Sequence, residues 1–394
     1  MTAPRVAFVL GTTSGGTGRH VAMLARACGE AGELAGVFGP EGSRVLLESA
    51  EVGFEPVAIA DRPRPASDLA AVRRLRRLLA GARAEVVHAH GLRAGALAAL
   101  ALGAGAARAA GAARAAGAAR AAGAARDRPG LIVTVHNAPP AGARLAAIYG
   151  VLERIVARRA DVVLCVSSDL EARMRGLGVR RVERAVVSAQ ILDGPYAPAD
   201  LGTSGRPVVL GVGRLAPQKG FDTLIAAASA WSDRTPRPLV VIAGDGPLDG
   251  ELERQARTLS VDARFLGSRH DVTALFAAAD VFVLPSRWEG QPLILQEALR
   301  AGRPIVACDV GGVRDLTGDE AALLVPPDDP AALSQAVLAV LDDAEFGRRL
   351  GAAAASRGAQ LPYESEAIAA ALRLYRSLAG PLEPKGAAGG ERGS

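Results

Sequence analysis

The chain has 394 residues, a length that predicts two or three domains with well-filled cores. Its hydrophobic content of 49% excludes a disordered chain, and its three scattered cysteines, Cys28, Cys165 and Cys308, exclude a disulfide framework or a clustered zinc site. A formal charge of +5 suggests a nucleic-acid partner, but aromatic residues at 4% supply few platforms for stacked bases, so we predict no such partner.

Arginine supplies almost all of the positive charge. Of the 46 basic residues, only Lys219 and Lys385 are lysines. This bias indicates a GC-rich genome, because arginine has GC-rich codons and lysine does not. A lysine within a motif is therefore more informative here than in an average protein.

The first half of the chain alternates apolar strands with helices. Strands are predicted at residues 5–10, 34–38, 85–88, 131–135 and 162–166. Strands that are apolar on both faces are typical of a parallel sheet, so the alternation predicts a doubly wound α/β domain over residues 1–195.

A second series of strands follows a linker that contains proline and glycine. Its strands are predicted at residues 208–212, 240–243, 263–266, 281–284, 305–308 and 322–325. The expected α/β fold therefore has two Rossmann-like doubly wound domains, the second over residues 206–364, that face a cleft at the carboxyl ends of their sheets. We expect a helix at 365–379 to pack back on the first domain, and a disordered tail at 380–394.

One segment breaks this alternation. From Gly105 the hexad GAARAA recurs, and the repeats end at Arg126. Each glycine costs about 1 kcal/mol relative to alanine in a helix, so we expect a low-complexity insertion over residues 105–126 that is at most a fraying helix. A repeat expansion without function is favoured over an arginine-rich surface tether.

Residues 67–79 form a basic amphipathic segment. Its apolar stripe comprises Leu69, Val72, Leu75, Leu78 and Leu79. We favour a surface helix packed on its sheet, and the alternative is a helix that lies on anionic lipid. Apolar runs elsewhere are too short for a signal sequence or a membrane span, so the expected location is the cytoplasm, with peripheral contact at the inner face of the membrane left open. We expect a monomer or a weak homodimer.

A glycine-rich loop, Gly11-Thr-Thr-Ser-Gly15-Gly16-Thr-Gly18, follows the first predicted strand. It lacks the Gly-Lys-Ser/Thr of a Walker loop and does not fit GxGxxG, which argues against a nicotinamide-dependent oxidoreductase. Backbone N–H groups of such a loop can approach an anion, or the loop can be only a tight turn; the sequence favours neither.

Two cations follow the strand predicted at 208–212. The strand runs into Gly213-Arg214, and Lys219-Gly220 precedes a helix expected near Phe221. Arginine as a fork and lysine as a point charge beside a helix N-terminus suit a diphosphate. A solvated pair of surface cations is the alternative, but the scarcity of lysine favours phosphate binding.

Two glutamates follow the strand predicted at 281–284. We expect Glu289 at the mouth of a helix whose first turn holds Pro292, and Glu297 inside that helix. The rise from Pro292 to Glu297 is about 7–8 Å, so the two carboxylates can address different ends of a ligand that carries sugar or ribose hydroxyls. An exposed acidic helix face fits poorly, because apolar residues surround Glu297.

The five histidines are interpreted separately. His136 follows a strand at the edge of the predicted cleft, where we favour contact with ligand. For His88 and His90 a structural role at a strand end is at least as well supported. His20 has no assigned role, and His270 is interpreted as a surface-loop residue.

Together these segments resemble the retaining glycosyltransferases of family 4, which have the GT-B fold. Glu289 and Glu297 form the family's Glu-x7-Glu motif, and the resemblance covers nearly the whole chain outside the hexads and the tail. Further segments in the family's order are Gly15-Gly16, His88-Ala-His90-Gly91, Val135-His136-Asn137, Gly213-Arg214, Lys219-Gly220, Asp245-Gly-Pro247, Phe265-Leu-Gly267 and Asp309-Val-Gly311-Gly312. Many members have Phe-Gly where this chain has Gln291-Pro292, a change that bears on the donor sugar, and Glu where it has Asp315.

The resemblance implies a role for each candidate residue. Glu297 would hold the nucleotide ribose, Arg214 and Lys219 the diphosphate, and Glu289 the donor sugar. The implied catalytic residues are Arg214, Lys219, Glu289 and His136. The implied donor-binding residues are Gly15, Gly16, Gly213, Gly290, Gln291, Pro292, Leu293 and Glu297.

The implied reaction is retaining transfer from a nucleoside-diphosphate sugar, with UDP favoured over GDP, in cell-envelope, polysaccharide or glycolipid biosynthesis. The acceptor is a carbohydrate, a lipid-linked molecule or a small molecule. The chain contains no Asp-x-Asp, so we expect no metal and no cofactor beyond the nucleotide-sugar co-substrate. The alternatives are a GT-B nucleotide-sugar epimerase or phosphorylase, or an enzyme that glycosylates a small secondary metabolite.

Overall fold

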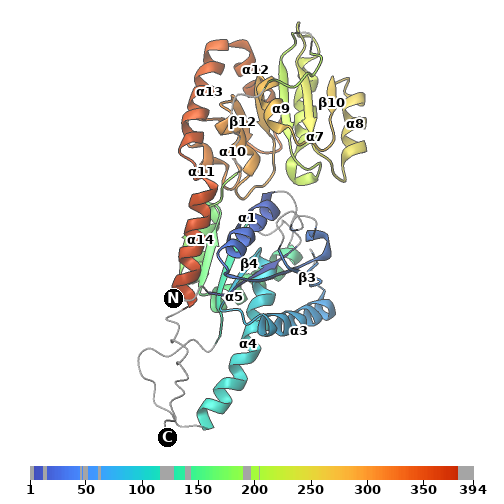
Figure 1. The fold of residues 1–394 in the computed structure, drawn as a ribbon. Helices are drawn as coiled ribbons and strands as arrows, with labels where there is room; N and C mark the ends of the chain where they lie inside the picture. The colour runs from blue at the N-terminus through green and yellow to red at the C-terminus, as the bar shows by residue number, and fades with distance from the viewer. Residues whose placement is uncertain are drawn as a thin grey trace.

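The computed structural model describes residues 4–11, 16–44, 47, 52–60, 64–115, 128–137, 143–189, 197–203 and 205–379. These residues form two α/β domains, one stacked on the other, with one helix along the side of the upper domain and a second helix along the same side of the lower domain (Figure 1). Each domain contains one parallel sheet with helices packed on both faces. The predicted fold class is therefore confirmed.

The described strands of the amino-terminal sheet have the order β3-β2-β1-β4-β5-β6-β7, and all neighbouring pairs are parallel. They are β1 (Val6–Leu10), β2 (Leu34–Gly39), β3 (Phe54–Pro56), β4 (Val86–His90), β5 (Gly130–Val135), β6 (Val162–Cys165) and β7 (Val182–Arg184). The edge strands β3 and β7 are not predicted from the sequence, whereas the equally short edge strands of the second sheet, β10 (Ala263–Phe265) and β13 (Leu323–Val325), are. Strand β4 runs two residues beyond its predicted end and includes His90.

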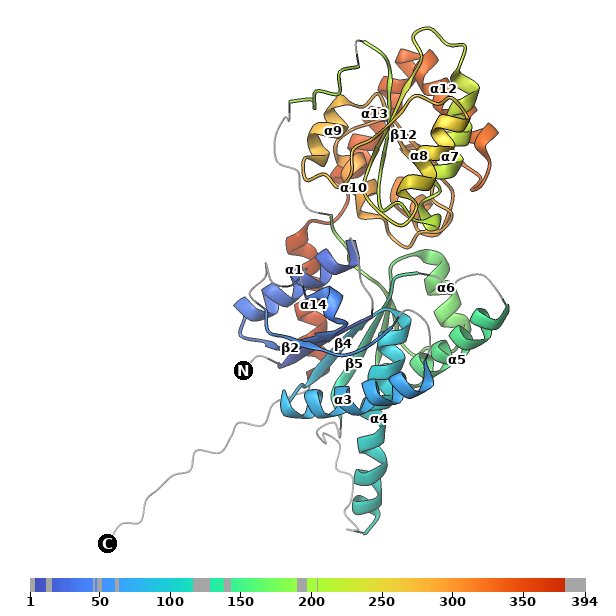
Figure 2. The ribbon, with the colours of Figure 1, turned by 90° about the vertical axis from the view of Figure 1, so that its right-hand side faces the viewer.

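Helices cover both faces of this sheet (Figure 2). One face packs against α1 (Gly16–Glu30) and α14 (Glu364–Ala379). The other packs against α3 (Pro65–Gly81), α4 (Leu92–Ala115), α5 (Ala143–Arg159) and α6 (Ser168–Gly176). The short helix η1 (Glu41–Ser43) follows β2.

The described strands of the carboxy-terminal sheet have the order β10-β9-β8-β11-β12-β13. They are β8 (Val208–Val212), β9 (Leu239–Ala243), β10 (Ala263–Phe265), β11 (Val281–Leu284), β12 (Ile305–Cys308) and β13 (Leu323–Val325). One face packs against α7 (Phe221–Ala228), α8 (Asp249–Thr258) and α12 (Pro330–Asp342). The short helix η2 (Pro217–Lys219) precedes α7, and η3 (Ser229–Trp231) follows it. The other packs against α9 (Val272–Ala278), α10 (Leu293–Arg300), α11 (Val313–Thr317) and α13 (Ala344–Ala359).

Helix α14 leaves the second domain and packs on the first, against α1 and β4. Tyr375 is fully buried there, and its hydroxyl lies 2.8 Å from Nδ1 of His88. Arg376 forms an ion pair of 2.7 Å with Glu33, whose side chain is 1% exposed. These contacts join the end of the chain to the amino-terminal sheet.

Two segments of the amino-terminal domain bear on expectations from the sequence. Helix α4 continues through Ala115, so the first hexads extend a helix that projects away from the sheet (Figures 1 and 2), while residues 116–126 and the tail lie outside the described ranges. In α3, Leu75 and Leu79 are buried but Leu69 is 50% exposed, so the predicted apolar stripe is only partly covered. Within the described part of the chain, none of the helices has the length and apolarity needed to cross a membrane.

Candidate functional site

The loop between β8 and α7 presents Lys219 at the carboxyl end of the second sheet. Gly220 follows with a φ of 63°, a left-handed conformation that glycine adopts without strain. A Cβ at Gly220 would overlap the carbonyl oxygen of Pro285, so glycine lets this loop lie directly against the segment after β11. A Cβ at Gly213 would lie 3.6 Å from Cδ of Lys219, which places the lysine stem over the end of β8.

Glu289 is a buried carboxylate with two donors on one oxygen. Its side chain is 6% exposed, and Nζ of Lys219 lies 2.5 Å from Oε1. The hydroxyl of Ser286, which is fully buried, donates to the same Oε1 at 2.7 Å. Both contacts fall on Oε1, so neither Lys219 nor Ser286 occupies the other oxygen, Oε2.

Arg287 braces the two loops that carry Lys219 and Glu289. Its guanidinium donates to both carboxylate oxygens of Asp222, at 2.6 and 2.9 Å, and to the carbonyl of Pro217 at 2.6 Å. It also donates to Asp328 at 2.6 Å. Burial is the largest single effect and raises the pKa of Asp222, but the hydrogen bonds and charge of Arg287 together with backbone hydrogen bonds outweigh it, so the pKa is lowered.

This brace escapes the sequence analysis because arginine is the ordinary cation of this chain. An arginine carries little information when nearly every basic residue is one. The only available signal is the position of Arg287 two residues before Glu289.

Glu297 lies inside α10 and faces the other domain. Its side chain is 5% exposed, and the nearest cation is Nη1 of Arg19 on α1, at 3.8 Å. Burial raises the pKa of Glu297, and the charges of Arg19 and Arg300 partly offset that rise. This carboxylate and a cation of the first domain therefore lie together where the two domains meet.

The two domains touch beside these carboxylates. A Cβ at Gly290 would overlap the carbonyl oxygen of His136, so only glycine permits this approach of the two backbones. A Cβ at Gly16 would lie 3.0 Å from the side chain of Leu293. The structure thus brings Gly16 and His136 of the first domain to Gly290 and Leu293 of the second.

His136 follows β5 at this contact. Burial lowers its pKa to about 3, so the imidazole is neutral at physiological pH. Its Nε2 lies 3.2 Å from Nδ1 of His90, the last residue of β4. Neighbouring parallel strands end side by side, which explains why residues 46 positions apart meet.

The remaining predicted residues lie around the same loops. Arg214 is exposed beyond β8. Oε1 of Gln291 is buried without a hydrogen-bond partner among the described residues. Pro292 is the N-cap of α10, which begins at Leu293, so the expectation that Pro292 lies in the first turn is wrong by one residue. Gly15 lies outside the described residues.

Two side chains of α10 hold the connections between the domains. Gln296 is fully buried and accepts from the backbone N–H of Ala189 at 3.0 Å. Arg300 donates to the carbonyl of Ala189 at 2.9 Å and to that of Pro362 at 2.8 Å. The helix that carries Glu297 therefore also forms hydrogen bonds to both segments that connect the domains, at Ala189 and at Pro362.

Asp315 of α11 caps a helix of the other domain. It accepts from the backbone N–H and the hydroxyl of Ser168, at 2.7 and 2.8 Å, and from Arg184 at 2.9 Å. A carboxylate at the N-terminus of α6 is favourable, because the helix dipole is positive there. Burial opposes its ionisation, but the bonds from Ser168 and Arg184 outweigh burial and lower the pKa of Asp315.

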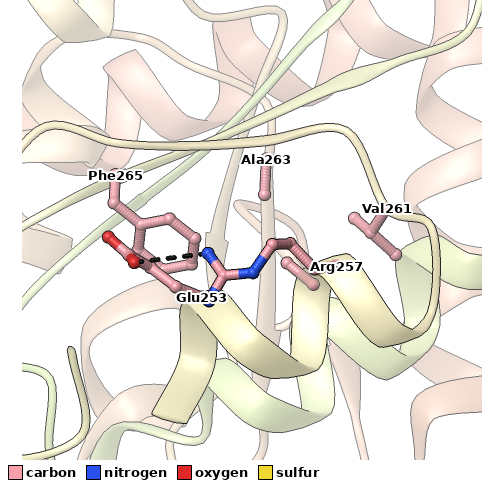
Figure 3. Close-up of a pocket in the computed structure, with 6 residues that line it drawn as sticks. Glu253, Arg257, Val261, Ala263 and Phe265 are labelled. Atoms are coloured by element: carbon pink, nitrogen blue, oxygen red, sulfur yellow. Dashed lines mark ion pairs between the residues drawn. The ribbon is translucent and has the colours of Figure 1, made fainter. Parts of the chain in front are cut away.

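A separate pocket of about 280 Å³ lies between α8 and β10 (Figure 3). Its lining includes Phe265 and the ion pair of Arg257 with Glu253, at 3.5 Å. None of the predicted site residues lines it. Among the described residues, no group of three His, Cys, Asp or Glu side chains is placed to hold a metal ion.

Solved structures share this two-domain arrangement. The crystal structure of HepE from Anabaena, in complex with UDP, matches with a TM-score of 0.74 at 19% identity, covering 95% of this chain and 100% of that chain. A sucrose-phosphate synthase from Thermosynechococcus elongatus matches with a TM-score of 0.71 at 21% identity, covering 96% and 99%. At these identities the matches show the fold, which is GT-B.

Sequence relatives identify the family. Residues 15–190 match the glycosyl transferase 4-like domain, and residues 206–343 match the glycosyl transferases group 1. An alpha-D-kanosaminyltransferase of Streptomyces kanamyceticus is 32% identical over 57% of this chain but only 63% of that enzyme, less than two thirds of its length. A phosphatidyl-myo-inositol mannosyltransferase of Mycolicibacterium smegmatis is 30% identical over 93% of this chain and 91% of that enzyme. The chain therefore belongs to family 4 of the glycosyltransferases.

Proposed function

We propose that this protein transfers a sugar from a nucleoside-diphosphate sugar to an acceptor, with retention of anomeric configuration and without a metal ion. The observation that carries the proposal is the pairing of Lys219 with buried Glu289 beside the point where Gly290 meets His136. A cation, a carboxylate and a neutral imidazole thus lie around one region where the two domains meet.

In this proposal the nucleotide-sugar donor extends from the carboxylate of Glu297 to that of Glu289. Glu297 accepts from the ribose hydroxyls, and Oε2 of Glu289 accepts from a hydroxyl of the transferred sugar. Arg214, Lys219 and the backbone at Gly213 and Gly16 face the diphosphate. The remaining donor-binding residues are Gly15, Gly290, Gln291, Pro292 and Leu293.

The proposed reaction breaks the bond between the anomeric carbon and the β-phosphate oxygen. The acceptor oxygen forms its bond to that carbon on the same face, and its proton passes to an oxygen of the leaving phosphate. Lys219 and Arg214 stabilise the negative charge that develops on the diphosphate. Removing one hydrogen-bond donor with such a role lowers the rate by roughly 100- to 1000-fold. His136 lies near the transferred sugar.

UDP is the favoured nucleotide, with GDP as the alternative. HepE, which shares this fold, was crystallised in complex with UDP, and this supports the choice. The acceptor is proposed to be a hydroxylated carbohydrate or lipid headgroup in cell-envelope, polysaccharide or glycolipid synthesis. A small secondary metabolite is the second candidate, because one relative is named as a kanosaminyltransferase.

Peripheral contact with an anionic membrane is also proposed. Leu69 is 50% exposed on α3, and Arg73 and Arg77 are exposed on the same helix. An apolar side chain flanked by arginines suits the surface of anionic lipid. Failure of the protein to float with anionic liposomes would contradict this part alone.

The central experiment combines ligand binding with turnover. A ligand at about 100 times its Kd adds about 2.7 kcal/mol of stability, so the matching nucleotide should raise Tm clearly in a screen of nucleoside diphosphates and their sugars. The matching donor alone should be hydrolysed slowly to nucleoside diphosphate and free sugar, at the same rate in excess EDTA, and NMR should show retained configuration in the transfer product.

Three results would contradict the proposal in separate ways. The absence of any nucleotide-induced shift would remove the donor site. A strict requirement for added metal would remove the metal-free mechanism. Conversion of the donor to an epimer would favour the epimerase alternative.

A further inference from the structure

Four histidines lie together at and near the carboxyl ends of β4 and β5. They are His20 on α1, His88 and His90 on β4, and His136 after β5. The rings of His88 and His90 lie 4.0 Å apart between centroids, and those of His90 and His136 lie 5.5 Å apart. The backbone of His136 lies against Gly290 of the second domain, and the side chains of the other three histidines are buried.

His90 connects His88 to His136. It is 1% exposed, and its Nδ1 lies 3.2 Å from Nε2 of His136. Its other nitrogen, Nε2, is buried without a hydrogen-bond partner among the described residues. The Phe8 ring stacks near His90 at 6.1 Å, so packing restricts rotation of the imidazole.

His88 supports the orientation of His90 from behind. Its two nitrogens contact the hydroxyls of Tyr375, at 2.8 Å, and Thr134, at 2.7 Å. A ring held at both nitrogens provides a fixed surface for the tilted His90 ring that packs against it. The orientation of His90 is therefore set by three strands and by α14.

The hydrogen bond between His90 and His136 requires a choice of tautomer. Burial lowers the pKa of both rings, so each is neutral and carries one proton. One arrangement has Nδ1–H of His90 donating to Nε2 of His136. In the other, Nε2–H of His136 donates, and His90 must then carry its own proton on Nε2.

The second arrangement leaves a buried N–H without an acceptor. Orphaned buried N–H groups are rare in proteins, whereas an acceptor with an unused lone pair is tolerated more often. The unpartnered Nε2 of His90 is therefore an unprotonated acceptor, and the proton of His90 is on Nδ1.

We propose that His90 is a positioning residue that donates from Nδ1–H to Nε2 of His136, and thereby holds His136 in the tautomer that carries its proton on Nδ1. His136 then meets the sugar as a hydrogen-bond donor through Nδ1–H. This consequence for the sugar rests on the proposed function, whereas the tautomer itself does not.

The first test measures the tautomer without substrate. The protein is labelled with ¹⁵N-histidine and prepared without a polyhistidine tag, so that five histidines contribute to the spectrum. The His136→Gln variant assigns the His136 signals. We expect a protonated Nδ1 and an unprotonated Nε2 in His136; a proton on Nε2 of His136 would overturn the proposal, whether or not transfer activity is found.

The second test compares two substitutions of His90. His90→Asn keeps an amide N–H near the place of Nδ1, whereas His90→Leu fills the site without a donor. We expect His90→Leu to lower kcat by roughly 10- to 100-fold, the size expected when a reactive group is misoriented, with less than about a threefold change in donor KM. His90→Asn should recover most of that loss.

Equal kcat values for the two folded variants would overturn the positioning role, as would a loss confined to KM. If His90→Leu does not fold, the tautomer in the unmodified protein still decides the matter. If the unmodified protein binds no nucleotide, that result counts against the proposed function instead.

Discussion

Lys219 has two anionic partners in the proposed reaction. Its Nζ lies 2.5 Å from Oε1 of Glu289, and both side chains are largely shielded from solvent. A diphosphate would bring further negative charge to the same ammonium group. Because a hydrogen bond between ionised groups is stronger than one between neutral groups, Glu289 can hold Lys219 in position for the leaving group.

Replacing Lys219 should therefore impair the chemical step more than it impairs folding. We expect Lys219→Ala to lower kcat by roughly 100- to 1000-fold, because one stabilising group for the leaving phosphate is lost. Steady-state kinetics with the matching donor measures the effect, and Lys385→Ala, at the only other lysine, is the control. A loss below about tenfold in a variant of unchanged Tm would contradict the role of Lys219.

Glu297 should impose a pH dependence on nucleotide binding. Its pKa is raised by burial, and ribose hydroxyls donate best to the ionised carboxylate. Affinity should therefore be full above the raised pKa and should weaken as pH falls through it, at a pH above the ordinary glutamate range. Calorimetric Kd values for the matching nucleoside diphosphate at several pH values test this.

Glu297→Gln is the control for that titration. The amide cannot ionise, so the variant should bind more weakly at neutral pH and should lose the acid dependence. An unchanged pH profile in Glu297→Gln would assign the titration to another group.

At the scale of elements, the loop that carries Lys219 and the loop that carries Glu289 act as one unit because Arg287 joins them. Its guanidinium reaches Asp222 at the start of α7 and the carbonyl of Pro217 in η2. Its backbone N–H also donates to the carbonyl of Gln218 at 2.8 Å. The loop that carries Lys219 is thus held by the loop that carries Glu289.

Removing this brace should misplace Lys219 without changing its charge. We expect Arg287→Ala to lower kcat/KM by roughly 100-fold, the effect that a displacement of about 1 Å can have on a reacting group. Arg287→Lys should recover only part of the loss, since a point charge cannot bond Asp222 and Pro217 in a fork. Arg348→Ala, on an exposed helix face, should change nothing. Full activity in Arg287→Ala would contradict the brace.

At the scale of the whole molecule, the buried histidines make the amino-terminal domain sensitive to acid. Burial lowers the pKa of His20 to about 4 and that of His136 to about 3, and it lowers those of His88 and His90 well below 6.5. Below pH 6.5 the unfolded chain binds protons that the folded chain does not. The free energy of unfolding should therefore fall as pH falls, by up to about 1.4 kcal/mol per pH unit for each histidine.

Urea unfolding of the amino-terminal domain between about pH 7 and pH 5 measures this slope. His20→Leu should reduce it, because His20 is buried and its Nδ1 has no partner among the described residues. His270→Gln should leave it unchanged, because His270 is exposed. A free energy of unfolding that does not vary over this range would contradict the prediction.

The sequence by itself determined the two α/β domains and most of their central strands. Strands such as Val6–Leu10 and Val281–Leu284 are apolar at every position, which is how a strand covered on both faces must be composed. It also singled out Lys219, Glu289 and Glu297, because a rare lysine and two acids among apolar residues conflict with ordinary surface or core composition. The short edge strands β3 and β7 and the Ala-rich α13 carry too weak a pattern to be found this way.

Only the tertiary structure decided which residues act on one another. The pairing of His90 with His136 depends on the parallel register of β4 and β5, and the contact of Gly290 with His136 depends on how the domains meet. The roles of Arg287, Arg300 and Asp315 depend on partners that lie far away in the chain. Periodicity reports which side of an element is buried; the distance between two side chains on different elements is set by packing, which local sequence does not encode.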